Sequence, residues 1–172
     1  MKESTTRILT RAAMTAALEI MLNRFASINT LGLKIGFSFV PIALCAMLSG
    51  PWVAGACYAL ADFLGAHLFP LGPYSPGFTV MAFAMGAVYG LFLYKKESLR
   101  LFPDILAPTL INCLIIGLCV NTLWVSVLYG SRTYWGWFVY RLAQYAVLIP
   151  VHLSLLPLLG RLSHILKKRG AA

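Results

Sequence analysis

Several side chains that form strong hydrogen bonds stand within long apolar stretches of this sequence. Glu19 and Asp62 are carboxylates, Arg141 is a cation, and Asn121 and Gln144 are amides. Charged and amide groups at membrane depth are costly, so each one needs a partner or a function. Carboxylates and amides can hydrogen-bond to the polar edge of a ring, and a cation can hold an anion. We therefore expect a binding pocket for a small polar molecule.

The apolar stretches that carry these residues are too extensive for a soluble domain. Of the 172 residues, 60% are hydrophobic and only 11% are charged. No charged residue occurs at positions 35–61, 63–94, 105–131 or 142–160. A helix that spans a bilayer needs about 20 apolar residues. The composition therefore predicts an all-α integral membrane protein.

We predict one transmembrane domain over residues 1–172, with six membrane-spanning helices. The helices are expected at 8–26, 35–49, 52–69, 78–94, 104–129 and 135–166. Gly50-Pro51 is typical of a tight turn between two of them, and Gly130 closes the fifth. Three prolines within 70–77 exclude a continuous helix there and predict an ordered loop. In the last helix, Pro150 and Pro157 predict kinks.

The distribution of basic residues predicts the orientation. An even number of spans puts both termini on one side of the membrane, and short loops with an excess of Lys and Arg are usually cytoplasmic. The net charge of +9 comes from short basic clusters between apolar stretches, which argues against nucleic-acid binding. The terminal side would hold Lys2, Arg7, Arg11, Lys95, Lys96, Arg100, Arg161, Lys167, Lys168 and Arg169, and the other side Arg24, Lys34, Arg132 and Arg141. Both termini are therefore expected in the cytoplasm.

The candidate binding residues concentrate between mid-membrane and the outer face. Two cations bracket the first outer loop, two aromatic residues flank the proline-rich loop, and one tryptophan follows Asn121 by about one helical turn. Internal ion pairing, for example between Glu19 and Arg141, would account for such residues without any ligand. The predicted ligand-binding set is Glu19, Arg24, Lys34, Asp62, Tyr74, Phe78, Asn121, Trp124, Arg141 and Gln144.

Two alanine ridges lie near the cytoplasmic end of the first helix. Ala12 and Ala16 are four residues apart, and so are Ala13 and Ala17. Small residues at this spacing let two helices approach closely in lipid. The ridges predict a docking face for another membrane protein, although packing inside the chain would explain the same pattern.

Residues arranged for catalysis or metal binding are not evident. The three histidines, His67, His152 and His164, lie far apart, and the sequence contains no P-loop. The cysteines, Cys45, Cys57, Cys113 and Cys119, occupy apolar stretches and are expected to be small core residues. We predict a protein without a metal or cofactor that is not an enzyme. A small membrane enzyme acting on lipid, or a purely structural subunit, remains the alternative from another class.

Several segments resemble the substrate-binding S components of energy-coupling factor (ECF) vitamin transporters. The first three are RFASI at 24–28, LKIGFSFVP at 33–41 and MLSGP at 47–51. Within that family, ADFLG at 61–65, PLGPYSPGFT at 70–79, YGLFLY at 89–94, NTLW at 121–124 and LYG at 128–130 are similar to the folate-specific subunits. The resemblance covers nearly the whole chain, and the Gly-Pro-Tyr loop is its most specific part.

This resemblance implies a six-helix S-component fold in a bacterial cell membrane and binding of folate from outside. It also implies partnership with a transmembrane coupling subunit and two cytoplasmic ATPases, with docking through an A-x-x-x-A face of the first helix. The chain departs from the family pattern at Ser75, where an aromatic residue is common. Riboflavin, thiamine and a deazapurine precursor are the alternative ligands.

Overall fold

The computed structural model describes residues 5–30, 33–70, 72–96, 99–130 and 133–170. Lys2 and Arg132, which entered the charge comparison, and Leu71 of the proline-rich loop lie outside these ranges. The elements in chain order are α1 (Thr5–Phe25), β1 (Ser27–Thr30), β2 (Leu33–Gly36), α2 (Phe39–Ser49), α3 (Pro51–Leu68), α4 (Pro76–Leu93), the π-helical η1 (Leu101–Ile105), α5 (Leu106–Leu110), the π-helical η2 (Ile111–Val120), α6 (Asn121–Tyr129) and α7 (Tyr134–Gly170).

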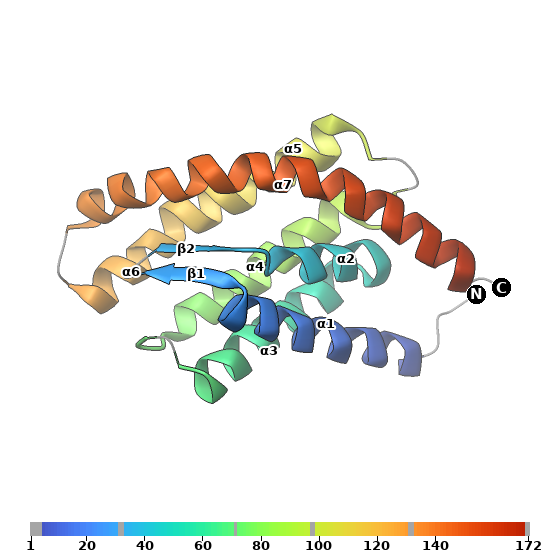
Figure 1. Ribbon diagram of the computed structural model, residues 1–172, viewed down its shortest axis with the longest axis horizontal. Helices are drawn as coiled ribbons and strands as arrows, with labels where there is room; N and C mark the ends of the chain where they lie inside the picture. Colours follow the sequence, from blue (N-terminus) through green and yellow to red (C-terminus); the bar gives the residue numbers. More distant parts are fainter. Residues whose placement is uncertain (1–4, 31–32, 71, 97–98, 131–132, 171–172) are drawn as a thin grey trace.

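The helices form an elongated bundle (Figure 1). The beginning of α1 and the end of α7 lie at one end of it, whereas α6 and the loop between α3 and α4 lie at the other. The two strands lie between α1 and α7 in this view, with β1 pointing towards α6 and β2 running the opposite way. Among the residues that the structure describes, three helical stretches are long and apolar enough to cross a membrane: Pro76–Leu93, Leu101–Tyr129 and Tyr134–Leu166. The apolar α2 is shorter.

Helix occupies most of each predicted range, and two predicted ends are confirmed. α2 ends at Ser49 and α3 begins at Pro51, with Gly50 between them at a φ of 90° that side chains rarely adopt. α6 ends at Tyr129, and the following Gly130 takes the left-handed conformation typical of a helix end. Ser75 lies at the start of α4, where its hydroxyl accepts a hydrogen bond from the Gly77 N–H.

A two-stranded hairpin corrects the prediction of an all-α chain. β1 and β2 pair antiparallel, with Ile28 opposite Ile35 and Asn29 opposite Lys34. The second helix was predicted to begin at Ile35, but α2 begins at Phe39. The alternation of apolar and polar residues around Lys34 is typical of a strand. The apolar residues that follow it led to the prediction that a helix begins here.

α3 and α4 pack with almost no side chain between their backbones. A Cβ added at Gly90 would lie 2.2 Å from the Pro51 Cα, and one added at Gly86 would lie 2.6 Å from the Ala54 carbonyl oxygen. The buried residues Ile42, Met47 and Leu156 belong to the main apolar cluster, which joins α2 to α7. These contacts hold fixed the helices that carry the polar residues described below.

The two alanine ridges of α1 have different surroundings. Ala13 and Ala17 are exposed, whereas Ala12 and Ala16 are half-buried. Ala12 packs against the main apolar cluster. Among the cysteines, Cys45, Cys57 and Cys113 are buried as expected, but Cys119 is exposed, which corrects its assignment to the core.

Candidate functional site

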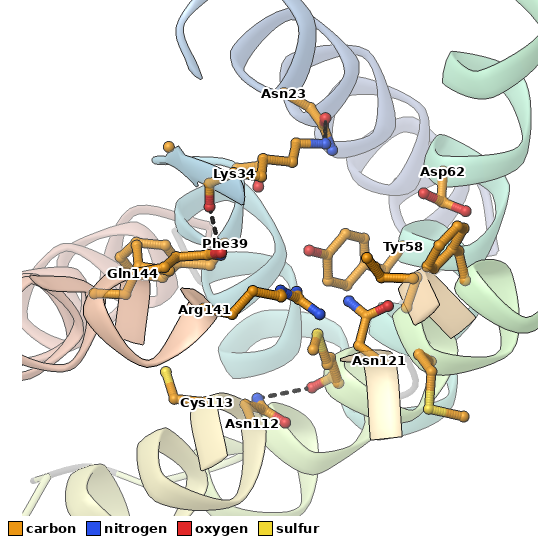
Figure 2. A pocket seen from close by; sticks show the side chains of 18 of the residues that line it. Asn23, Lys34, Phe39, Tyr58, Asp62, Asn112, Cys113, Asn121, Arg141 and Gln144 are labelled. Atoms are coloured by element: carbon orange, nitrogen blue, oxygen red, sulfur yellow. Dashed lines mark hydrogen bonds between the residues drawn. The ribbon is translucent and has the colours of Figure 1, made fainter. Parts of the chain in front are cut away.

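A cavity of about 320 Å³ opens between the hairpin and the helices that surround it. Polar side chains converge on it from α1, β2, α3, η2, α6 and α7 (Figure 2). Eight of the ten predicted ligand-binding residues line this cavity: Arg24, Lys34, Asp62, Tyr74, Phe78, Asn121, Arg141 and Gln144. The structure therefore brings together residues that are up to 120 positions apart, counted from Arg24 to Gln144.

Arg141 lies on the α7 wall and is only 4% exposed. Its guanidinium donates to the Thr122 hydroxyl at 2.9 Å and to the Tyr145 hydroxyl at 3.2 Å. Both acceptors are neutral, and the ion pair between Glu19 and Arg141 considered above does not match these contacts. The positive charge of Arg141 is therefore available to an anion in the cavity.

The hairpin contributes Lys34 to the cavity wall. The Lys34 ammonium donates to Asn23 Oδ1, and the Gln144 amide donates to the Lys34 carbonyl oxygen at 2.7 Å. These two bonds join β2 to α1 on one side and to α7 on the other. Burial and, to a smaller extent, the nearby positive charge of Arg24 lower the pKa of Lys34 to about 8, whereas Glu19 and Asp62 act in the opposite direction.

Asp62 is tied to the proline-rich loop through two hydroxyls. Thr79 Oγ1 donates to Asp62 Oδ2 at 2.9 Å, and the Tyr74 hydroxyl lies 2.9 Å from Thr79 Oγ1. The Tyr74 ring also meets the rings of Phe63 and His67, with centroids 6.0 and 5.0 Å apart. The loop residue Tyr74 is thus fixed at the cavity by both hydrogen bonds and ring contacts.

Buried polar atoms without a partner in the described part of the chain face this region. Buried polar groups in folded proteins are almost always hydrogen-bonded, so such atoms call for a ligand or water. Among the cavity residues they are Arg24 Nε, Asn112 Oδ1, Asn121 Oδ1, Arg141 Nε and Gln144 Oε1. The set includes donors and acceptors, so it suits a ligand that carries both.

Two of the predicted residues do not line the cavity. Glu19 is completely buried, and its Oε1 accepts a hydrogen bond from Asn23 Nδ2. Trp124 covers the first turn of α4, where a Cβ added at Gly77 would lie 2.2 Å from Trp124 Cε2. Both residues support side chains or backbone that do reach the cavity.

The sequence prediction missed part of the cavity wall. Tyr58 lines the cavity one helical turn before Asp62, and the i, i+4 spacing was the signal for it. Deeper in the cavity, His152 Nδ1 lies 3.2 Å from the Tyr89 hydroxyl and 3.4 Å from Cys113 Sγ. The ring centroids of His152 and Phe39 are 3.7 Å apart. Each of these residues stands in an apolar stretch, where it looks like an ordinary core residue.

The helical bundle and its polar cavity define a substrate-binding subunit of a membrane transporter. The chain belongs to the family of ECF transporter substrate-specific components, which it matches over residues 7–160. It is therefore a membrane transport component, and the alternative of a lipid-processing enzyme is excluded.

Two similar proteins are more than a third identical to this chain over the aligned residues. The folate transporter FolT of Clostridium novyi (strain NT) is 40% identical over 141 residues, which cover 81% of this chain and 80% of the relative. The crystal structure of FolT bound with folic acid matches with a TM-score of 0.84 at 34% identity, covering 92% of this chain and 94% of the other. The S component of a bacterial ECF transporter matches with a TM-score of 0.51 at 21% identity, covering 98% and 97%, which supports the shared fold.

Proposed function

We propose that this protein binds folate at the outer face of the membrane and delivers it as the substrate-specific subunit of an ATP-driven ECF importer. The observation that carries the proposal is the set of unpaired buried donors and acceptors around the cavity, in a chain that is 34% identical to FolT bound with folic acid. Burying such groups without partners costs free energy, which a bound ligand would recover.

The chemistry of the cavity suits the two ends of folate. The pterin ring has an amide-like edge that Asn112 and Asn121 can hydrogen-bond, and flat faces that aromatic rings such as Tyr74 can cover. The glutamate end is anionic and suits Lys34 and Arg141. A neutral or cationic vitamin would leave these two cations without an anionic partner.

We further propose that residues 1–172 form one domain that crosses a bacterial cell membrane six times, with both termini in the cytoplasm. The excess of basic residues on the terminal side supports this orientation. The common end of α1 and α7 in Figure 1 supports an even number of spans. This topology puts the hairpin and the loop between α3 and α4 at the outer face.

The partners in this proposal are a transmembrane coupling subunit and two cytoplasmic ATPases. Ala13 and Ala17 form the exposed ridge of α1, so they are the better placed of the two pairs to contact a coupling subunit. Small side chains there permit the close helix contact on which association in lipid depends. Ala12 and Ala16 face inward and serve the packing of α1 against its own bundle.

The proposal is tested by equilibrium binding to the purified protein. Folic acid, riboflavin, thiamine and a deazapurine precursor are titrated separately, and small molecules that copurify are identified by mass spectrometry. We expect one molecule of folic acid to bind and the other three to bind far more weakly. Tighter binding of any of those three, or no binding of folic acid by folded protein, would overturn the assignment.

A further inference from the structure

Glu19 is a completely buried carboxylate in α1 that does not line the cavity. Its Oε1 accepts a hydrogen bond from Asn23 Nδ2, while Oε2 has no hydrogen-bond partner within the described part of the chain. Keeping a carboxylate at this depth is costly, so a role is expected for it. The hydrogen bond from Asn23, which itself accepts from Lys34, connects Glu19 to the cavity wall.

Lys34, Asn23 and Glu19 are joined by a chain of two consecutive hydrogen bonds, in which Lys34 donates to Asn23 and Asn23 donates to Glu19. The Lys34 ammonium can only donate, and it donates to Asn23 Oδ1. The Asn23 amide must then turn its Nδ2 away from Lys34, towards a group that accepts. Glu19 provides that acceptor, so it fixes which way the amide faces.

The backbone is held at two of these three residues, Asn23 and Lys34. The Ser27 hydroxyl donates to the Asn23 carbonyl oxygen at the end of α1, and the Gln144 amide donates to the Lys34 carbonyl oxygen from α7. With its backbone held by α7, Lys34 needs only the Asn23 contact to direct its ammonium. Figure 2 shows the Lys34 side chain extended towards Asn23 along the edge of the cavity.

The surrounding charges give Glu19 a second effect on Lys34. Arg24 and Lys34 line the same cavity and repel each other, whereas Glu19 and Asp62 attract Lys34. Asp62 lines the cavity, but Glu19 stands behind the wall. In its ionised form, Glu19 offsets the repulsion between the cations from behind the wall, without competing with an anionic ligand for space.

We propose that Glu19 is a positioning residue that, through Asn23, holds the Lys34 ammonium at the cavity wall for the anionic part of the ligand. This inference rests on the proposed binding of folate. Removing the Glu19 acceptor frees the Asn23 amide to rotate, and a rotated amide presents its N–H group to Lys34. The Lys34 ammonium then loses its hydrogen-bond acceptor and is no longer held at the cavity wall.

The test compares Glu19→Leu, which removes the acceptor at similar size, with Glu19→Gln, which keeps an oxygen for Asn23. We expect Glu19→Leu to weaken folic acid binding about tenfold, which is typical for loss of a hydrogen bond in a charged network. Glu19→Gln should stay within about threefold of the unmodified protein, because the direction of the chain is preserved. Binding of 6-hydroxymethylpterin, which lacks the anionic tail, should be unchanged in both variants.

A double-mutant cycle identifies the route of the effect. In a Lys34→Ala background, Glu19→Leu should weaken folic acid binding no further, whereas its effect should persist undiminished in an Arg141→Ala background. Full additivity with Lys34→Ala, or equal weakening of 6-hydroxymethylpterin binding, would overturn the inference. If Glu19→Leu does not fold, Asn23→Leu carries the same test, since it breaks the chain at its middle. Failure of the unmodified protein to bind folic acid would instead count against the proposed function.

Discussion

The difference between the two alanine ridges of α1 predicts opposite effects of the same substitution. Ala13→Trp and Ala17→Trp add a large side chain on the exposed face, whereas Ala12→Trp and Ala16→Trp add it on the half-buried face. Exposed substitutions usually change stability by no more than about 0.5 kcal/mol. Extra volume in a packed region costs about 1–3 kcal/mol. The Ala12→Trp and Ala16→Trp variants, the inward pair, should therefore be clearly less stable than the Ala13→Trp and Ala17→Trp variants, the outward pair.

The substitutions on the exposed ridge should impair folate uptake without impairing folic acid binding. Trp at position 13 or 17 would hold a coupling subunit away from α1, and we expect uptake to fall at least about tenfold, because association in lipid depends on close packing. The cavity lies nearer the opposite end of the bundle, so folic acid affinity should stay within about twofold. Ala12→Trp and Ala16→Trp should lower thermal stability and ligand affinity together.

The assay pairs ligand titration and thermal unfolding of each purified variant with uptake of labelled folate by cells that express the whole complex. Ala13→Ser and Ala17→Ser are the matched controls, since serine keeps the ridge small. Normal uptake by both outward tryptophan variants would refute docking through this ridge. Full stability of both inward variants would refute the packing argument.

Other expectations concern the cavity, the bundle and transport. Affinity for folic acid should fall by up to about tenfold per pH unit as pH rises above about 8, because Lys34 then loses its proton. The Lys34→Arg variant stays charged, so its affinity, measured by titration at each pH, should change much less over this range. Arg141→Ala should weaken folic acid binding at least about thirtyfold, since loss of a buried charge partner costs about 2–5 kcal/mol, and an unchanged dissociation constant would contradict its assignment. Gly90→Ala should lower stability by about 1–3 kcal/mol in thermal unfolding, because its Cβ would meet the Pro51 backbone, with Ala87→Ser as the control on the same helix. Vesicles that contain only this chain should show no uphill uptake of folate, and net accumulation would contradict a role as a subunit.

The helices could be predicted from sequence because long apolar stretches alternate with glycine, proline and charged residues. The turn at Gly50 and the end at Gly130 follow from the same signals. The hairpin could not, since strands of four residues give too few alternations to outweigh the apolar residues that follow. Cys119 was misplaced for a related reason, because an apolar stretch does not show which of its residues face outward.

Residues of the cavity wall could be predicted where a charged side chain interrupts an apolar stretch. Asp62 and Arg141 stand out within apolar stretches, and both line the cavity. Glu19 is also a charged residue in an apolar stretch, but it lies behind the cavity wall. Whether it lines the cavity or lies behind its wall depends on how α1 is rotated about its axis, which is set by packing. The deep residue His152 carries no signal, since a single histidine among aliphatic residues is typical of a core position.

The π-helical segment η2 affects how related chains should be aligned. It contains Asn112 and ends directly before Asn121, and both of these residues line the cavity. In an α-helix, one deleted residue turns everything that follows by about 100°. A π-helical turn holds an extra residue, so a deletion there can be absorbed by reverting to α-helical hydrogen bonding. Homologues with a one-residue gap in this segment should therefore keep α6 facing the same ligand, whereas a gap within α3 ahead of Asp62 would turn that carboxylate away.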